Sequence, residues 1–162
     1  MAFDAFLYEL GLNNLRVVRI QLNPSRWQKF CDDHKLTWEF IPFESNLVDQ
    51  IPELPGMYCF YIGHNLQCLP KLGLSLYGGI ATKQTLKARF KNYLREKNSP
   101  NGRINVRKFL NVFEGELFFG WVISKDTSTL AELEKAFNDA MMPPYSIRDF
   151  SAEVRKGRNA WQ

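Results

Sequence analysis

Two charged side chains, Arg89 and Glu134, fall on the apolar faces of segments with helical periodicity. Arg89 lies one residue before Phe90 and four before Tyr93, so the helical period places it among side chains that face a core. Glu134 lies three residues before Phe137 and is placed in the same way. A charge turned toward a core is costly unless it is paired or used. The pattern therefore indicates either a buried Arg89–Glu134 salt bridge or a functional site.

Two tyrosines in predicted strands extend this set. Tyr58 lies in the run MYCFYI, and Tyr77 ends the run LSLY, immediately before Gly78 and Gly79. The glycines let the backbone turn and let a ligand approach closely. A single tyrosine in a strand is ordinarily a core or interface residue. The two tyrosines are therefore interpreted as site residues only together with the two misplaced charges.

A small α+β domain is predicted to position these side chains. Two β runs follow each other without a helix between them, which favours an antiparallel hairpin. A third β run and two amphipathic helices follow, so we expect a three-stranded, mainly antiparallel sheet with packed helices. The expected elements are strands at 57–62, 74–77 and 117–123, a helix at 82–96, and a helix opened by a Thr129–Glu132 capping box and ending at Met142.

The domain is expected to begin after a Pro-rich and Gly-containing boundary, IPELPG. Residues 1–50 are interpreted as an N-terminal extension packed on or beside the core, 51–150 as the domain, and 151–162 as a loose basic tail. Within the extension we expect a short helix at 3–10, a strand at 16–22, and a helix to about residue 35 that Asn23 and Pro24 open.

Other features of the sequence favour a cytoplasmic protein. No apolar stretch reaches the ~20 residues that a membrane span needs, and Asp4 and Glu9 lie where a signal peptide is apolar. Cys31, Cys59 and Cys68 form no CxxC pair. They predict neither a disulfide framework nor a zinc finger.

Positive charge is concentrated in one part of the chain. Nine lysines and arginines and one glutamate lie between Lys83 and Lys108, so this segment carries +8 although the whole chain carries +4. Such a block is typical of a polyanion-binding surface, and its alternative is a solvated helix face. The residues expected to contact nucleic acid are Lys83, Lys87, Lys91, Arg95, Arg103, Arg107 and Lys108.

Taken in order, these motifs resemble those of the GIY-YIG nuclease family. Departures occur at Gly78 in the middle of the second signature, at Ile80 where the family often has lysine, and at Ser146 where it has asparagine. The literal string YIG at 61–63 lies too close to Tyr58 for a hairpin to separate them. The matching segments are Gly56-Met57-Tyr58, Tyr77-Gly78-Gly79, Leu86 to Phe90 with Arg89, Tyr93, Glu134, and Pro143 to Ser146.

The resemblance implies an endonuclease that hydrolyses DNA phosphodiester bonds with Mg²⁺ or Mn²⁺. Glu134 would hold the metal ion, and Arg89 would hold a non-bridging phosphate oxygen. Either Tyr58 or Tyr77 would act as the general base or orient the attacking water. DNA is the expected partner, with no membrane and no cofactor beyond the metal, and a homodimer is left open. Supporting roles are expected for Tyr93, Lys83, Lys87 and Ser146.

Two other functions are compatible with the same residues. One is a degenerate GIY-YIG domain that binds nucleic acid without cutting it. The other is an unrelated α+β interaction module in which the Arg89–Glu134 pair is structural. Within the nuclease interpretation, a restriction-like enzyme or one encoded by a phage or mobile element is expected.

Overall fold

A computed structural model of the chain describes residues 18–64, 72–148 and 150–159. The described residues form an α+β fold with a four-stranded, fully antiparallel sheet in the order β1-β4-β2-β3. The predicted helix at 3–10 and Cys68 lie outside the described residues. The strands are β1 (Glu39–Pro42), β2 (Gly56–His64), β3 (Leu72–Ala81) and β4 (Leu117–Ile123).

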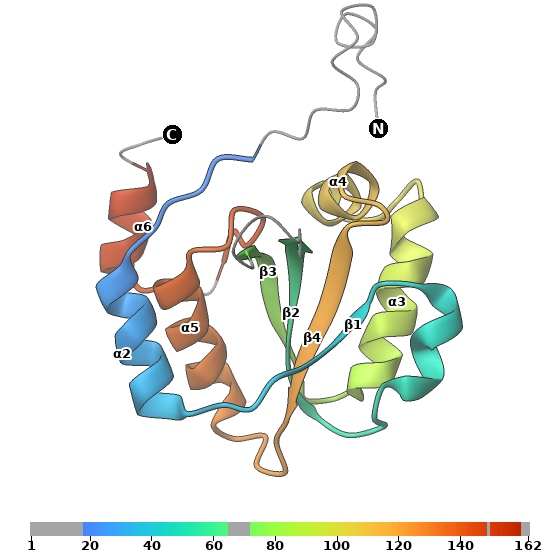
Figure 1. Ribbon diagram of the computed structural model, residues 1–162, viewed down its shortest axis with the longest axis horizontal. Helices are drawn as coiled ribbons and strands as arrows, with labels where there is room; N and C mark the ends of the chain where they lie inside the picture. Colours follow the sequence, from blue (N-terminus) through green and yellow to red (C-terminus); the bar gives the residue numbers. More distant parts are fainter. Residues whose placement is uncertain (1–17, 65–71, 149, 160–162) are drawn as a thin grey trace, which may run out of the picture.

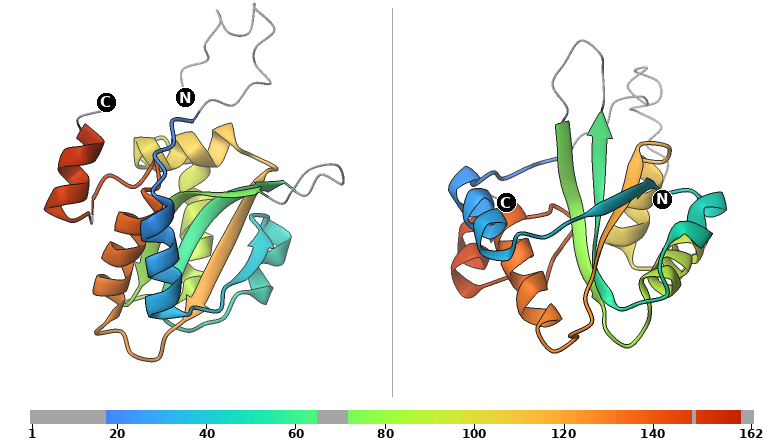
Figure 2. Two further views of the ribbon diagram at one scale, coloured as in Figure 1. Left: turned by 60° about the vertical axis from the view of Figure 1, so that its left-hand side comes forward. Right: turned by 60° about the horizontal axis from the view of Figure 1, so that its bottom comes forward.

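Helices cover both faces of this sheet (Figure 1). On one face lie α2 (Pro24–His34), α5 (Leu130–Met141) and α6 (Ala152–Asn159). The other face carries α3 (Leu86–Asn98), α4 (Ile104–Val112) and the 3₁₀ helix η1 (Ser45–Gln50). Figure 2 shows the same three layers from two further directions.

Each face of the sheet buries its own apolar cluster. Phe60 and Phe119 pack against α3 and α4, with Phe90 and Phe109 among their neighbours. On the opposite face, Met57 and Cys59 belong to the cluster of α2 and α5. The alternation of β2 residues between the two clusters follows the period of two in a strand. Because β3 is an edge strand, side chains from both layers can meet around it.

The sheet has one strand more than the sequence analysis predicted. β1 pairs with β4 through a register that includes Ile41 opposite Phe119. This strand has only four residues and ends in Pro42, so it carries too little alternation to be recognised. Proline is tolerated at an edge strand because one side of the backbone makes no ladder hydrogen bonds.

Several predicted boundaries also need correction. No strand forms in the described part of 16–22, and α4 was not predicted at all. The segment 151–162 is not a loose tail in its described part, because α6 forms there and buries Arg158. The guanidinium of Arg158 donates from Nη1 to the Ser146 carbonyl at 2.9 Å and lies 4.2 Å from the Phe150 ring centroid.

Other predicted elements are confirmed. β2, β4 and the β2–β3 hairpin form as expected, although β3 continues through Gly78 and Gly79. Helix α2 begins as predicted, with the Asn23 side chain accepting from the Arg26 amide at 3.1 Å. No helix of the described residues is both long and apolar enough to cross a membrane.

The capping box predicted at Thr129 is wrong. Thr129 adopts a helical conformation, and its side chain makes no capping hydrogen bond. The loop is held instead by Asp126, which accepts from the Ser128 amide at 2.9 Å. The first turn of α5 therefore owes less to its N-cap side chain than α2 does.

This difference predicts unequal costs for two alanine substitutions. Asn23→Ala should lower the free energy of unfolding by about 1 kcal/mol, because it removes a capping hydrogen bond. Thr129→Ala should cost clearly less, since no capping bond is lost. Urea denaturation of the two variants measures both changes, and equal costs would contradict the assignment of the caps.

Candidate active site

Gly78 and Gly79 leave the edge strand β3 without side chains on either face. A Cβ atom at Gly79 would lie 2.5 Å from the hydroxyl oxygen of Tyr58, its partner across the strands. A Cβ atom at Gly78 would lie 2.9 Å from the Phe137 ring on the opposite face. The glycines therefore let a phenol approach from the side of α3 and a helix approach from the side of α5.

Tyr58 is buried over this bare backbone and forms a hydroxyl pair with Tyr93 of α3. The two hydroxyl oxygens are 2.8 Å apart, and the residues are 2 % and 1 % exposed. Burial is the main reason why the pKa of each tyrosine is raised above its usual value. Both phenols are therefore held in their protonated forms.

The two charged residues with unexpected positions act on the same phenol from different helices. Arg89 of α3 lowers the pKa of Tyr58 and Glu134 of α5 raises it, while burial remains the larger effect. Both side chains are half-buried, and the Nε of Arg89 is a buried donor without a hydrogen-bond partner. Residues that lie on helices covering opposite faces thus come within electrostatic reach of one atom.

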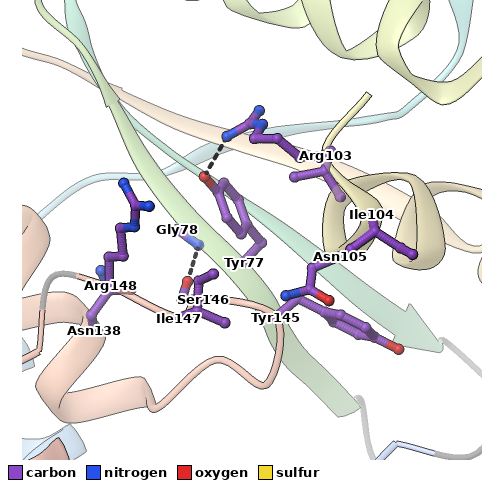
Figure 3. A pocket seen from close by; sticks show the side chains of 11 residues that line it. Tyr77, Gly78, Arg103, Ile104, Asn105, Asn138, Tyr145, Ser146, Ile147 and Arg148 are labelled. Carbon is purple, nitrogen blue, oxygen red and sulfur yellow. Dashed lines mark hydrogen bonds between the residues drawn. The ribbon is translucent and has the colours of Figure 1, made fainter. Parts of the chain in front are cut away.

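Tyr77 is more accessible than Tyr58 and is held by an arginine. Arg103 Nη1 donates to the Tyr77 hydroxyl at 3.3 Å, and Figure 3 shows the two side chains directed toward each other. Glu96 accepts from Nε and Nη2 of Arg103, each at 2.9 Å. These bonds raise the pKa of the Arg103 guanidinium. Burial alone would raise the pKa of Glu96, but Arg103 outweighs it and the pKa is lowered.

The residues predicted to support the site differ in burial and in their partners. Ser146 is buried, and its hydroxyl accepts from the Gly78 amide at 3.2 Å. Lys83 is exposed. Lys87 instead forms ion pairs with Asp49 at 3.0 Å and Glu53 at 3.3 Å. Its charge is thus compensated by two carboxylates of the protein itself.

The residues of the basic block differ in direction and in pairing. Lys87 and Lys91 share one side of α3 by their spacing of four, whereas Arg89 is directed away from them by the helical period. Lys97 pairs with Glu114, and Arg107 donates to the Pro100 carbonyl at 3.0 Å. Lys91, Arg95 and Lys108 remain exposed. The cations of the block therefore face at least two sides of the molecule, and part of their charge is neutralised by ion pairs.

A cavity of about 530 Å³ borders Gly78 and was not anticipated from the sequence (Figure 3). It lies between β3, the start of α4, α5 and the loop after α5. Tyr145 of this loop donates its backbone N–H to the Leu76 carbonyl at 3.0 Å, so the loop runs along the free edge of β3. Asn138 lines the cavity and was not predicted as a site residue. Its helical spacing of four from Glu134 is the signal that could have found it.

Glu134, the residue predicted to hold a metal ion, is half-buried on α5. Glu134 supplies a carboxylate, which suits Mg²⁺ because that ion keeps several waters and needs one or two protein carboxylates. In the part of the chain that the structure describes, no group of three or more His, Cys, Asp or Glu side chains could hold a metal ion. Burial raises the pKa of the Cys59 thiol to about 12, so this residue stays a thiol in the core.

Comparisons of this chain with protein-family models, with curated proteins and with solved structures found no match.

Adding a methyl group to Gly79 tests the close approach of Tyr58. Gly79→Ala should lower the free energy of unfolding by about 1–3 kcal/mol, because the new Cβ overlaps the Tyr58 ring. Gly73→Ala in the same strand is the matched control, since its Cβ would lie 3.5 Å from the nearest ring atom. Equal effects of the two substitutions in urea denaturation would refute the close contact.

The hydroxyl pair of Tyr58 and Tyr93 predicts strong coupling between two substitutions. Tyr93→Phe leaves a buried hydroxyl without its partner and should cost about 1–3 kcal/mol. Adding Tyr58→Phe removes that hydroxyl as well, so the double variant should cost less than the sum of the single ones. A double-mutant cycle in urea measures this coupling, and additive costs would contradict it.

The same pair predicts how stability falls in alkali. In the unfolded chain these phenols titrate near ~10, whereas their pKa values are raised in the folded protein. The stability that they contribute is therefore complete below about pH 10 and is lost as the pH rises above it, by up to ~1.4 kcal/mol per pH unit for each tyrosine. The Tyr58→Phe/Tyr93→Phe variant should show a shallower decline.

Proposed function

We propose that this chain is a metal-dependent endonuclease of the GIY-YIG type that hydrolyses phosphodiester bonds in DNA. One observation carries the proposal: the bare backbone at Gly78 and Gly79 lies between Tyr58, which packs against α3, and the α5 residues Phe137 and Asn138. Arg89 of α3 and Glu134 of α5 both influence the pKa of the Tyr58 phenol from these two sides. An arginine and a carboxylate that converge at a bare strand edge suit a phosphate diester and its divalent cation.

Arg89 is proposed to stabilise the negative charge of the scissile phosphate. Its buried Nε has no hydrogen-bond partner, which is costly in a folded protein unless a ligand accepts the bond. A guanidinium presents forked donors that match two phosphate oxygens. Charge develops on these oxygens in the transition state, where a preorganised cation stabilises it most.

Tyr77 is the better candidate for contact with the attacking water. Tyr58 is 2 % exposed, already bonded to Tyr93 and held protonated by burial. Tyr77 is half-buried, lines the cavity, and accepts a hydrogen bond from Arg103. Because the Tyr77 oxygen accepts from Arg103, its own hydroxyl proton points away from Arg103. The second lone pair of the oxygen can then accept a hydrogen bond from water. Tyr58 is therefore assigned a positioning role beneath the site.

Glu134 is proposed as the protein ligand of Mg²⁺. The bound ion would supply Lewis acidity at the phosphate and stabilise the leaving oxygen. The negative charge of Glu134 contributes to the raised pKa of the Tyr58 phenol and the positive charge of Arg89 opposes it, which supports a shared site for the two residues. Within the basic block, Arg103 contacts the edge strand directly through its bond to Tyr77.

Replacing Glu134 by glutamine separates the proposed chemistry from binding. Glu134→Gln should retain the fold and the affinity for DNA, because glutamine is nearly isosteric and a good helix former. Mg²⁺-dependent cleavage should fall by several orders of magnitude, since transition-state charge is left unneutralised. Cleavage of linear and branched DNA, filter binding and melting temperature are measured on the same preparation. Glu132→Gln, at an exposed position of the same helix, is the control.

The same measurements distinguish the other two functions. A wild-type protein that binds DNA and cleaves none with Mg²⁺ or Mn²⁺ is the degenerate, binding-only domain. If Arg89 and Glu134 form a structural pair in an interaction module, Glu134→Gln should cost about 3–5 kcal/mol of stability, and the wild-type protein should not bind DNA. Cleavage by Glu134→Gln at the wild-type rate would refute the assigned metal ligand.

A further inference from the structure

The cavity beside Gly78 has a polar floor whose hydrogen-bonding capacity is incomplete. Asn138 is 1 % exposed, and its Oδ1 atom has no hydrogen-bond partner. Ser146 is 3 % exposed, and its Oγ atom accepts from the Gly78 amide, so its own hydroxyl proton stays available. A buried acceptor left without a donor costs about 1–3 kcal/mol. The floor thus offers one acceptor and one donor to a ligand.

Two Arg–Ile pairs line the same cavity from different elements. Arg103 and Ile104 stand at the start of α4, and Ile147 and Arg148 lie in the loop after α5 (Figure 3). Ile104 is 79 % exposed and Ile147 is 66 % exposed, more than any other large apolar side chain among the described residues. Both arginines are exposed as well. Each pair combines a cation with an aliphatic surface in contact with solvent.

The polar floor, the two arginines and the two isoleucines together indicate the chemical class of the ligand. A volume of about 530 Å³ lies within the range of small-molecule pockets, roughly 300–1,000 Å³. The floor suits a planar group with both a donor and an acceptor, whereas the arginines suit anions. Exposed aliphatic side chains beside such a pocket suit contact with base faces, as apolar wedges make between base steps. A nucleotide unites these three properties in one molecule.

We propose that this cavity takes up one unstacked nucleotide of a DNA strand, which rests on the proposed function and adds a recognition site to it. Asn138 and Ser146 bind the edge of the base, and Arg103 and Arg148 bind the flanking phosphates. Ile104 and Ile147 contact the neighbouring bases and replace part of the stacking that is lost. The nucleotide comes either from a duplex by extrusion or from a single strand.

A fluorescent base tests this proposal with the full-length Glu134→Gln protein, which keeps the DNA intact during the measurement. The probe is DNA with one 2-aminopurine, prepared as a duplex and as a single strand. Fluorescence should change on binding, because this base responds to leaving its stack. A change with the duplex identifies extrusion, and a change confined to the single strand identifies strand capture. Adding Ile104→Ser and Ile147→Ser should abolish most of the change.

Two further variants keep the test decisive. Ile123→Ser alters an exposed isoleucine on β4, outside the cavity, and should leave the signal unchanged. Asn138→Leu removes the unpaired acceptor and should weaken binding of the probe up to about tenfold, the equivalent of one hydrogen bond. If circular dichroism shows that Asn138→Leu is misfolded, the two isoleucine substitutions decide the outcome, because both positions are exposed.

The failure of this inference differs from the failure of the proposed function. DNA binding and wild-type cleavage without a fluorescence change would overturn the nucleotide pocket and leave the nuclease intact. An unchanged signal in the Ile104→Ser/Ile147→Ser variant would also overturn the pocket. A fluorescence change in a protein whose wild-type form never cleaves would support the pocket and overturn the nuclease. If the protein binds neither the duplex nor the single strand, both the nucleotide pocket and the nuclease are overturned.

Discussion

The bare backbone of the edge strand at Gly78 and Gly79 is the constraint on which the rest of the site depends. Successive residues of a strand point to opposite faces, so two adjacent glycines remove the side chains from both faces at one place. The Tyr58 phenol occupies the space over Gly79, and α5 approaches Gly78 through Phe137 and Asn138. With a larger residue at either position, a ring or a helix would have to move.

Buried polar atoms without partners are found on both sides of this edge. Arg89 Nε and Asn138 Oδ1 belong to helices that cover opposite faces of the sheet. Each atom lost its hydrogen bond to water on folding and gained no partner in the protein, which costs free energy. The surrounding core compensates for the cost, because Phe60 and Phe90 bury large rings on the face of α3 and Phe137 buries one on the face of α5. Local costs supported by a well-packed core are typical of functional sites.

Ion pairs with carboxylates compensate part of the positive charge that the sequence concentrates between Lys83 and Lys108. Lys87 is compensated by Asp49 and Glu53, and Arg103 is oriented by Glu96 toward Tyr77. Both cations are thus paired with carboxylates of the protein, but Arg103 is in addition held at the strand edge by its bond to Tyr77. If the proposed function holds, position relative to this edge matters more than the number of cations for contact with a phosphate.

Local patterns in the sequence were sufficient for β2, β4 and the cap of α2, because apolar, aromatic-rich runs and the Asn23–Pro24 pair act over a few residues. The same patterns identified Arg89 and Glu134 as charges with unexpected positions. Only the tertiary structure placed their helices on opposite faces and buried Tyr58 while leaving Tyr77 accessible. It also created the cavity around Asn138. Strand order and the path of the loop after α5 determine where these residues lie. Both depend on packing between segments far apart in the chain, so a local sequence pattern cannot predict them.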